Sequence, residues 1–458
     1  MGETIMDYKL LFENVKLHRL FLIVAIPSII SMVVSGLYQV IDGIFVGRFL
    51  GAQAFAAINL VMPLVIINFS VAELIGVGSS VPIAIKLGEK DYKTANTIFT
   101  SACILIVLSG FVLGGTFFIF TESILRLMGA DETMISLGAQ YFKVYALAAP
   151  FNLIMFAVDN YLRICGKIKY SMFTNIAVSV MIMIVEFLML GVFGWGIWAA
   201  ALASCLGMGI GTLICFIPFL TGKTQLHFVK PQLTRKIVGT IFTNGFPSFF
   251  SNVSGRVASI LINVYLIRLG GAAAVATYGV LMYVDGIVNQ VLYGLCDSLQ
   301  PAVGYNYGAG NHERVKKIVS MCFGVCALIS FVLMGLFVFG REALATLFIR
   351  TEDQAIIELT VHAMMLFTAS FAFRWLSLAA QCYFTAVSQY TYATVIATAT
   401  AFAFPILFLL TLVGPLGLNA IWLNMPLSAL TAAALSVVLL LVSGKKQEAA
   451  RWADCQDA

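Results

Sequence analysis

Charged residues are scarce in this sequence. Asp, Glu, Lys and Arg make up 11% of the 458 residues, whereas soluble domains carry about 25%. Apolar residues make up 60%, and the mean hydropathy is +0.96. The apolar residues form long continuous runs, which excludes a β-barrel, because barrel strands alternate in polarity over about 10 residues. The composition therefore predicts an all-α integral membrane protein.

Sequence motifs of enzymes are also lacking. No GxxxxGK[ST] segment occurs, which argues against ATP-driven transport by this chain. The four histidines are scattered, without the spacing of metal ligands. The nine cysteines lie mostly inside apolar runs, where cysteine acts as a small apolar side chain. We therefore expect no enzyme, no cofactor and no disulfide framework, and the short basic clusters do not indicate binding to nucleic acid.

Twelve apolar runs are long enough to cross a bilayer, which takes about 20 residues. The first six are predicted at 20–46, 53–77, 96–120, 138–161, 170–191 and 196–219. The other six are predicted at 239–267, 274–298, 315–340, 357–383, 391–412 and 418–442. We predict an N-terminal lobe at 1–220, a connector at 221–237, a C-terminal lobe at 238–444 and a tail at 445–458.

The distribution of Lys and Arg predicts the orientation of the chain. These residues gather in the N-terminal segment, in the loops that follow even-numbered spans, and in the tail. Cytoplasmic loops carry such an excess of basic residues. Both termini and the connector are therefore predicted to be cytoplasmic.

The two halves of the chain resemble each other. Pro27-Ser28 is repeated as Pro247-Ser248, and the same spacing of 220 residues relates Arg48 to Arg268 and Gly51 to Gly271. Because each half has an even number of spans, the repeats share one orientation. The sequence predicts two six-helix lobes related by a pseudo-two-fold axis along the membrane normal, as in alternating-access carriers.

Ionisable residues inside spans are costly and usually functional. In the C-terminal half, Asp285 and Asp297 stand against Arg256 and Arg374, so this set can neutralise itself as ion pairs. The N-terminal half has a surplus of carboxylates, contributed by Asp42, Glu73, Asp159 and Glu186. Such a surplus needs an external cation or protons.

Helical spacing places several polar residues on shared faces. Pro27, Tyr38 and Asp42 recur at helical intervals in the first span, and Asn175 and Glu186 do so in the fifth. We predict that these faces form a hydrated pocket in which proton and cation compete, which is the requirement for antiport. Pro27 breaks a helical hydrogen bond and is a candidate hinge.

Two of these acids have a structural alternative. Asp159 can form an ion pair with Arg163, one helical turn further on. Glu73 can pair with a neighbouring helix. The residues leave both alternatives open.

Three segments resemble motifs of bacterial multidrug and toxic compound extrusion (MATE) transporters, of the MOP flippase superfamily. They are Asp42–Gly51 (DGIFVGRFLG) in the first span, Gln300–Gly310 (QPAVGYNYGAG) after the eighth, and Arg163–Lys167 (RICGK) after the fourth. The resemblance extends over nearly the whole chain. It implies a monomer in the bacterial plasma membrane that exports cationic or amphipathic compounds, driven by H⁺ or Na⁺. Carried over by position, the family's cation site corresponds to Asp42, Asp159, Glu186 and Ser204.

The sequence departs from this family pattern at two places. The Asn that usually precedes the acid of the fifth helix is Ile182 here, which removes one oxygen ligand for Na⁺ at Asp42 and Glu186. Where some members carry acids in helices seven and ten, this chain has Arg256 and Arg374. We therefore favour H⁺ and leave Na⁺ open. A flippase for lipid-linked oligosaccharides or other amphipathic lipids is the alternative function.

Overall fold

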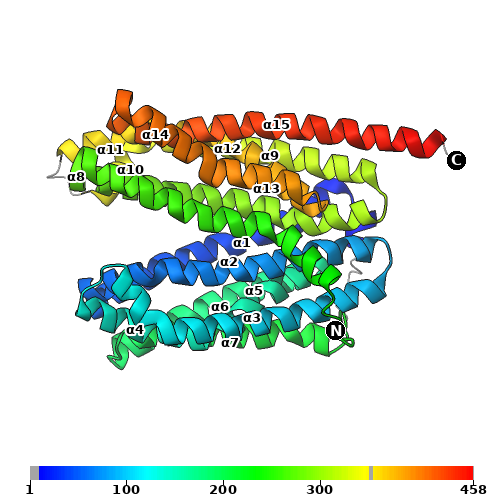
Figure 1. The fold of residues 1–458 in the computed structure, drawn as a ribbon, viewed down its shortest axis with the longest axis horizontal. Coiled ribbons are helices and arrows are strands. Elements are labelled where there is room, and N and C mark those ends of the chain that lie inside the picture. Colours follow the sequence, from blue (N-terminus) through cyan, green and yellow to red (C-terminus); the bar gives the residue numbers. More distant parts are fainter. Residues whose placement is uncertain (1–9, 350–353, 457–458) are drawn as a thin grey trace. The chain divides into compact units, whose positions relative to one another are not determined.

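The computed structural model describes residues 10–349 and 354–456, and no strand occurs among them (Figure 1). The first half contains α1 (Leu17–Phe45), α2 (Ala52–Gly88), α3 (Tyr92–Leu127), α4 (Glu132–Leu147), α5 (Ala149–Ile164), α6 (Ile168–Phe187) and α7 (Ile197–Leu220). The second half contains α8 (Arg235–Gly308), α9 (His312–Phe339), α10 (Arg341–Phe348), α11 (Gln354–Phe367), α12 (Phe371–Ala386), α13 (Tyr390–Thr398), α14 (Phe404–Leu416) and α15 (Leu418–Gln456). Short π- or 3-10-helical turns are η1 (Leu10–Asn14), η2 (Val46–Leu50), η3 (Leu188–Val192), η4 (Thr368–Ser370) and η5 (Ala399–Ala403).

The helices confirm the predicted membrane fold. Within the described residues, eleven helices are long and apolar enough to span a bilayer, and the pair α4–α5 forms a twelfth span with a bend of 55°. Each of the twelve predicted runs coincides with one of these spans. The helices extend beyond several predicted runs, because polar residues continue a helix past the apolar stretch. The predicted tail at 445–458 likewise continues α15 as far as Gln456.

The internal repeat is visible in the backbone. Gly51 (φ 86°) separates α1 from α2, and Gly271 (φ 58°), 220 residues later, divides α8 into two spans. Lys90 (φ 63°) and Gly310 (φ 74°) show the same spacing. A positive φ is unfavourable for residues with a Cβ, which explains glycine at three of these four turns.

Packing divides the described chain into two compact units. Unit 1 combines residues up to Val253 with Ser298–Ile318 and Ala386–Ser388, and unit 2 contains the remainder. These units do not coincide with the predicted lobes, because parts of α8 pack inside unit 1. A Cβ at Gly88 would collide with the carbonyl oxygen of Tyr305, and one at Gly308 with that of Ile85. This reciprocal contact brings the backbones of α2 and α8 together, as small residues do between membrane helices.

The N-terminal turn η1 packs on this same end of unit 1. Phe12 is completely buried, and its ring lies 5.8 Å from that of Tyr305. Arg314 donates hydrogen bonds to the carbonyl oxygens of Phe12 (2.7 Å) and Val15 (2.6 Å). The Tyr305 hydroxyl donates to Glu13 at 2.8 Å. The segment before α1 is therefore bound to the α8–α9 junction.

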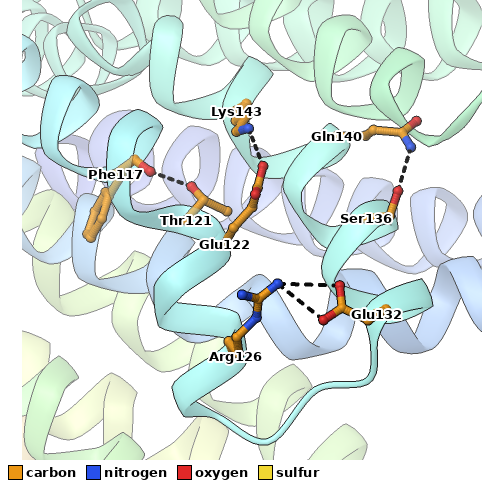
Figure 2. A network of polar contacts seen from close by, with 8 residues as sticks. All are labelled: Phe117, Thr121, Glu122, Arg126, Glu132, Ser136, Gln140 and Lys143. Atoms are coloured by element: carbon orange, nitrogen blue, oxygen red, sulfur yellow. Dashed lines mark hydrogen bonds and ion pairs between the residues drawn. The ribbon is translucent and has the colours of Figure 1, made fainter.

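The turn between α3 and α4 carries exposed polar contacts (Figure 2). Arg126 pairs with Glu132 at 3.1 Å, and Lys143 of α4 pairs with Glu122 of α3 at 2.6 Å. Exposed pairs of this kind contribute about 0–1 kcal/mol each. They align α4, whose opposite face is buried against α2 and α7.

Unit 2 is held together by the long helix α15, which contacts α11 and α14. Trp422 on α15 is completely buried, and Asn424 donates to the carbonyl oxygen of Pro405 at 2.7 Å. A second cluster joins α12 to α13 through Phe384, Ala393 and Ile396.

Candidate cation-binding site

Three helices of unit 1 bring four of the predicted residues together. Tyr38 and Asp42 come from α1, Glu186 from α6 and Ser204 from α7. The Tyr38 hydroxyl lies 2.8 Å from Ser204 Oγ, and the Asp42 carboxyl lies beside that of Glu186. Residues more than 140 positions apart in the sequence therefore form one polar cluster.

Aromatic packing sets the register of α1 against α6. Phe45, one turn after Asp42, packs on Phe187, which directly follows Glu186, with ring centroids 5.8 Å apart. Phe49 adds an edge contact to Phe187 at 6.0 Å. Both helices change to a π-helical turn immediately afterwards, α1 at η2 and α6 at η3. Such π-turns are frequent at functional sites.

In the acidic pair Glu186 is buried and Asp42 is half-buried, and no basic side chain of the described residues compensates them. Glu186 has an exposed fraction of 0%, and neither of its carboxyl oxygens has a hydrogen-bond partner among the described residues. Neither Asp42 nor Glu186 forms an ion pair with a Lys or Arg of the described chain. Two adjacent carboxylates in a low dielectric repel each other strongly. The pair can therefore hold a proton or accept a cation.

Additional side chains surround this pair. Tyr141 and Tyr145 from α4 are buried and lie close enough to Asp42 to interact with it electrostatically. Asn152 on α5 contacts Cys205 Sγ at 3.7 Å, while its Oδ1 is buried without a partner among the described residues. Tyr141, Tyr145 and Cys205 were not predicted as site residues. The four-residue spacing of the two tyrosines, which places them on one helix face, is the sequence signal that could have identified them.

Asp159 and Asn175 lie together in a second network. Asp159 forms an ion pair with Arg163 at 2.8 Å, and its Oδ1 accepts hydrogen bonds from Ser171 (2.5 Å) and Asn175 (2.9 Å). Asp159 therefore forms the ion pair with Arg163 that was its structural alternative, and its charge is compensated one helical turn away. The part of Asp159 and Asn175 in cation coupling stays a prediction.

The remaining predicted residues are placed as follows. Pro27 is buried inside α1, which continues through it as one helix. Glu73 on α2 accepts a hydrogen bond from Asn252, so the alternative of pairing with a neighbouring helix is present for this acid as well.

The charged set of unit 2 neutralises itself in part. Asp285 on α8 forms an ion pair with Arg374 on α12, and Arg374 also reaches Asn289 Oδ1 at 3.4 Å. Asp297 is buried, whereas Arg256 is exposed. The predicted self-neutralisation is therefore seen for Asp285 with Arg374.

An all-helical chain with a twofold backbone repeat and an uncompensated acidic pair defines a polytopic membrane carrier. Residues 27–188 and 247–411 match the MatE family model, one segment in each half, and the chain belongs to this family.

The similarity to known proteins extends over most of the chain. It is 25% identical to the multidrug export protein MepA of Staphylococcus aureus strain N315, covering 94% of this chain and 95% of that protein. It is 27% identical to MepA of Staphylococcus saprophyticus, covering 70% of this chain and 72% of that protein. A crystal structure of MATE in a bent conformation superposes with a TM-score of 0.89 at 21% identity, covering 97% of this chain and 99% of that one.

Proposed function

We propose that this chain is a secondary multidrug efflux transporter that exports organic cations and amphipathic compounds in exchange for H⁺ or Na⁺. The observation that carries the proposal is the acidic pair of Asp42 and Glu186, which has no compensating basic side chain among the described residues. The MepA proteins to which the chain is similar are multidrug export proteins.

In this mechanism, proton and substrate compete for the same negative charge. When Glu186 is protonated, the pair carries one negative charge, on Asp42. Loss of the proton adds a second negative charge, which favours binding of a cationic substrate. The rings of Tyr38, Tyr141 and Tyr145 offer faces to which organic cations are attracted. The twofold repeat supplies the two halves that rock against each other in alternating access.

Proton coupling fits the residues better than sodium coupling. Na⁺ needs several oxygen ligands, and the cluster offers two carboxylates, Ser204 and the unpartnered Oδ1 of Asn152. Ile182, one turn before Glu186, is buried and supplies no oxygen. A carboxylic acid needs no such ligand shell to bind a proton.

The basic residues of the sequence and the family support a proposal for the location of the chain. We propose a monomer in the bacterial plasma membrane with both termini in the cytoplasm, since basic residues gather on that side. The flippase alternative requires free basic groups for anionic phosphates. Its support in the sequence is Arg256 and Arg374, of which Arg374 is paired with Asp285.

Transport by reconstituted protein tests this proposal. Proteoliposomes loaded with ethidium should lose the dye when a pH gradient is imposed in the coupling direction, and more weakly or not at all under a Na⁺ gradient. Glu186→Gln should reduce gradient-driven export to background. Glu132→Gln, which changes an exposed acid of the same type on α4 (Figure 2), should leave export unchanged.

Two results would overturn the proposal. One is export of ethidium that ignores both imposed gradients, and the other is unaltered coupling in both Glu186→Gln and Asp42→Asn.

A further inference from the structure

Four cysteines of unit 2 gather where α8, α9 and α12 meet. Cys296 lies on α8, Cys322 and Cys326 lie one turn apart on α9, and Cys382 lies near the end of α12. The Sγ atoms of Cys296 and Cys326 are 3.4 Å apart, and those of Cys322 and Cys326 are 3.9 Å apart. All three Sγ atoms lie within 4.8 Å of one another, and Cys382 is close enough to interact with them electrostatically.

These thiols are well protected. The exposed fractions are 2% for Cys296, 7% for Cys322, 0% for Cys326 and 8% for Cys382. Burial alone is common for cysteine, which packs as a small apolar residue. Apolar packing alone does not explain why four side chains from three helices are all cysteine at this place, because any small apolar side chain would pack equally well.

The geometry matches a sulfur-ligated metal site. With a metal–sulfur bond of about 2.3 Å, ligand sulfurs lie about 3.8 Å apart in a tetrahedral site and about 4.0 Å apart in a trigonal one. The sulfur separations of 3.4 and 3.9 Å are close to these values. Only small side-chain rotations are needed to place three sulfurs around one ion.

We propose that Cys296, Cys322 and Cys326 form a binding site for a soft divalent metal ion of the Zn²⁺ or Cd²⁺ type. Thiolates select such ions over Mg²⁺, Ca²⁺ and Na⁺, which prefer oxygen ligands. Binding converts three thiols to thiolates and releases three protons, so that M²⁺ with three sulfurs carries one net negative charge. Divalent ions leave less residual charge inside the membrane than monovalent ions do. Cys382 is available as a fourth, neutral sulfur next to the site.

Occupation of this site would join α8 to α9 in unit 2. Cys296 belongs to the same helix as Asp285. A bound ion would therefore stabilise the packing of α8 against α9, by a free energy that grows with the logarithm of its concentration relative to its dissociation constant. This inference does not depend on the proposed transport function, because it concerns another unit and is tested without a transport measurement.

Metal binding by purified full-length protein tests the site. The chain is held reduced with a phosphine, dialysed against Cd²⁺ or Zn²⁺, and assayed for bound metal per chain and for the sulfur-to-metal charge-transfer absorption of Cd²⁺. We expect one tightly bound ion per chain and a raised unfolding temperature. The triple variant Cys296→Ala/Cys322→Ala/Cys326→Ala should lose that ion and the rise in temperature.

A matched variant controls for the number of thiols. Cys103→Ala/Cys165→Ala/Cys215→Ala removes three buried cysteines from unit 1 and should keep the bound ion. If the first triple variant does not fold, Cys322→Ser alone should weaken binding at least tenfold. X-ray absorption of the wild-type Zn²⁺ complex should show sulfur ligands at about 2.3 Å.

The proposal is overturned by any of three results. These are a reduced wild-type chain that binds no stoichiometric ion, equal binding by the two triple variants, and a ligand shell of nitrogen and oxygen. Disulfide formation between Cys296 and Cys326 in air, without metal binding after reduction, belongs to the first of these results.

Discussion

The acidic pair of unit 1, Asp42 with Glu186, and the acid Asp285 of unit 2 have different surroundings, although unit 1 also contains a paired acid, Asp159 with Arg163. In unit 2, Asp285 is paired with Arg374, and the ion pair connects α8 to α12. In unit 1, Asp42 and Glu186 lie side by side, and Glu186 has no hydrogen-bond partner among the described residues. A paired charge contributes to structure, whereas an unpaired one is a standing cost that a ligand can relieve. The difference supports the proposal that the site of ion exchange lies in unit 1.

Removal of the guanidinium of Arg374, which pairs with Asp285, should have the largest effect on stability. Arg374→Leu leaves the half-buried Asp285 without its partner and should destabilise the protein by about 3 kcal/mol, the lower end of the cost of breaking a buried pair. Thermal unfolding in detergent measures this loss. The double variant Arg374→Leu/Asp285→Leu removes both charges and should unfold close to the wild type. A double variant as unstable as Arg374→Leu would contradict the interpretation.

The unpaired site should respond in the opposite direction. Glu186→Gln removes the repulsion between two carboxyls and allows the new amide to donate to Asp42, so we expect a gain of about 1 kcal/mol. The same variant should lose gradient-driven export, as stabilised active sites often do. Unfolding temperature and ethidium export from one preparation measure both effects. A loss of stability similar to that of Arg374→Leu would remove the distinction between the two sites.

An exposed acid with a local partner provides an intermediate case. Asp91, before α3, accepts a hydrogen bond from the backbone N–H of Thr94 at 3.1 Å. The Thr94 side chain and, to a smaller extent, this N–H lower the pKa of Asp91. Asp91→Ala should cost about 0.5–2 kcal/mol, as for other helix caps.

The contribution of Asp91 is present above the ordinary pKa of aspartate and is lost as the pH falls through the lowered value. Unfolding curves of wild type and Asp91→Ala should therefore converge in acid. Asp91→Asn, which keeps an acceptor oxygen, is the control. A difference between wild type and Asp91→Ala that stays constant down to the lowest pH would count against the cap.

The exposed pairs between α3 and α4 should matter least. Glu132→Gln breaks the contact with Arg126 and should change stability by less than about 1 kcal/mol, because solvent screens both groups. Thermal unfolding at low and high salt should show a difference that shrinks with salt. A larger loss of stability that salt does not reduce would contradict the interpretation of Arg126 and Glu132 as a solvent-screened surface pair.

Hydropathy predicted the spans well because an apolar run in a membrane has few alternatives to a helix. The bend between α4 and α5 lies beside Pro150, and a kink at this proline was predictable because proline breaks an intrahelical hydrogen bond. The start of α4 was missed, since the residues from Glu132 onward are polar. Periodicity placed Tyr38 and Asp42 on one face correctly. It could not decide where Asp159 points, because a helix face can meet a neighbouring helix or a pocket. Arg163, one turn away, decides the outcome in the structure.

Contacts between distant segments of the chain could not be predicted from the sequence. Cys322 and Cys326 share a helix face by spacing, yet nothing in the sequence brings Cys296 to them. The reciprocal contact of Gly88 with Tyr305 and Gly308 with Ile85 depends likewise on the packing of α2 against α8. The sequence showed the internal repeat at Gly51 and Gly271 but did not indicate this contact.

The attachment of the N-terminal turn has a mechanical consequence. Phe12 and Val15 are bound through their carbonyl oxygens to Arg314, while the chain continues two residues later into α1. Arg314 therefore holds the start of α1 at the α8–α9 junction. Asp42 lies near the other end of the same helix, so one continuous helix connects this attachment to the acidic pair.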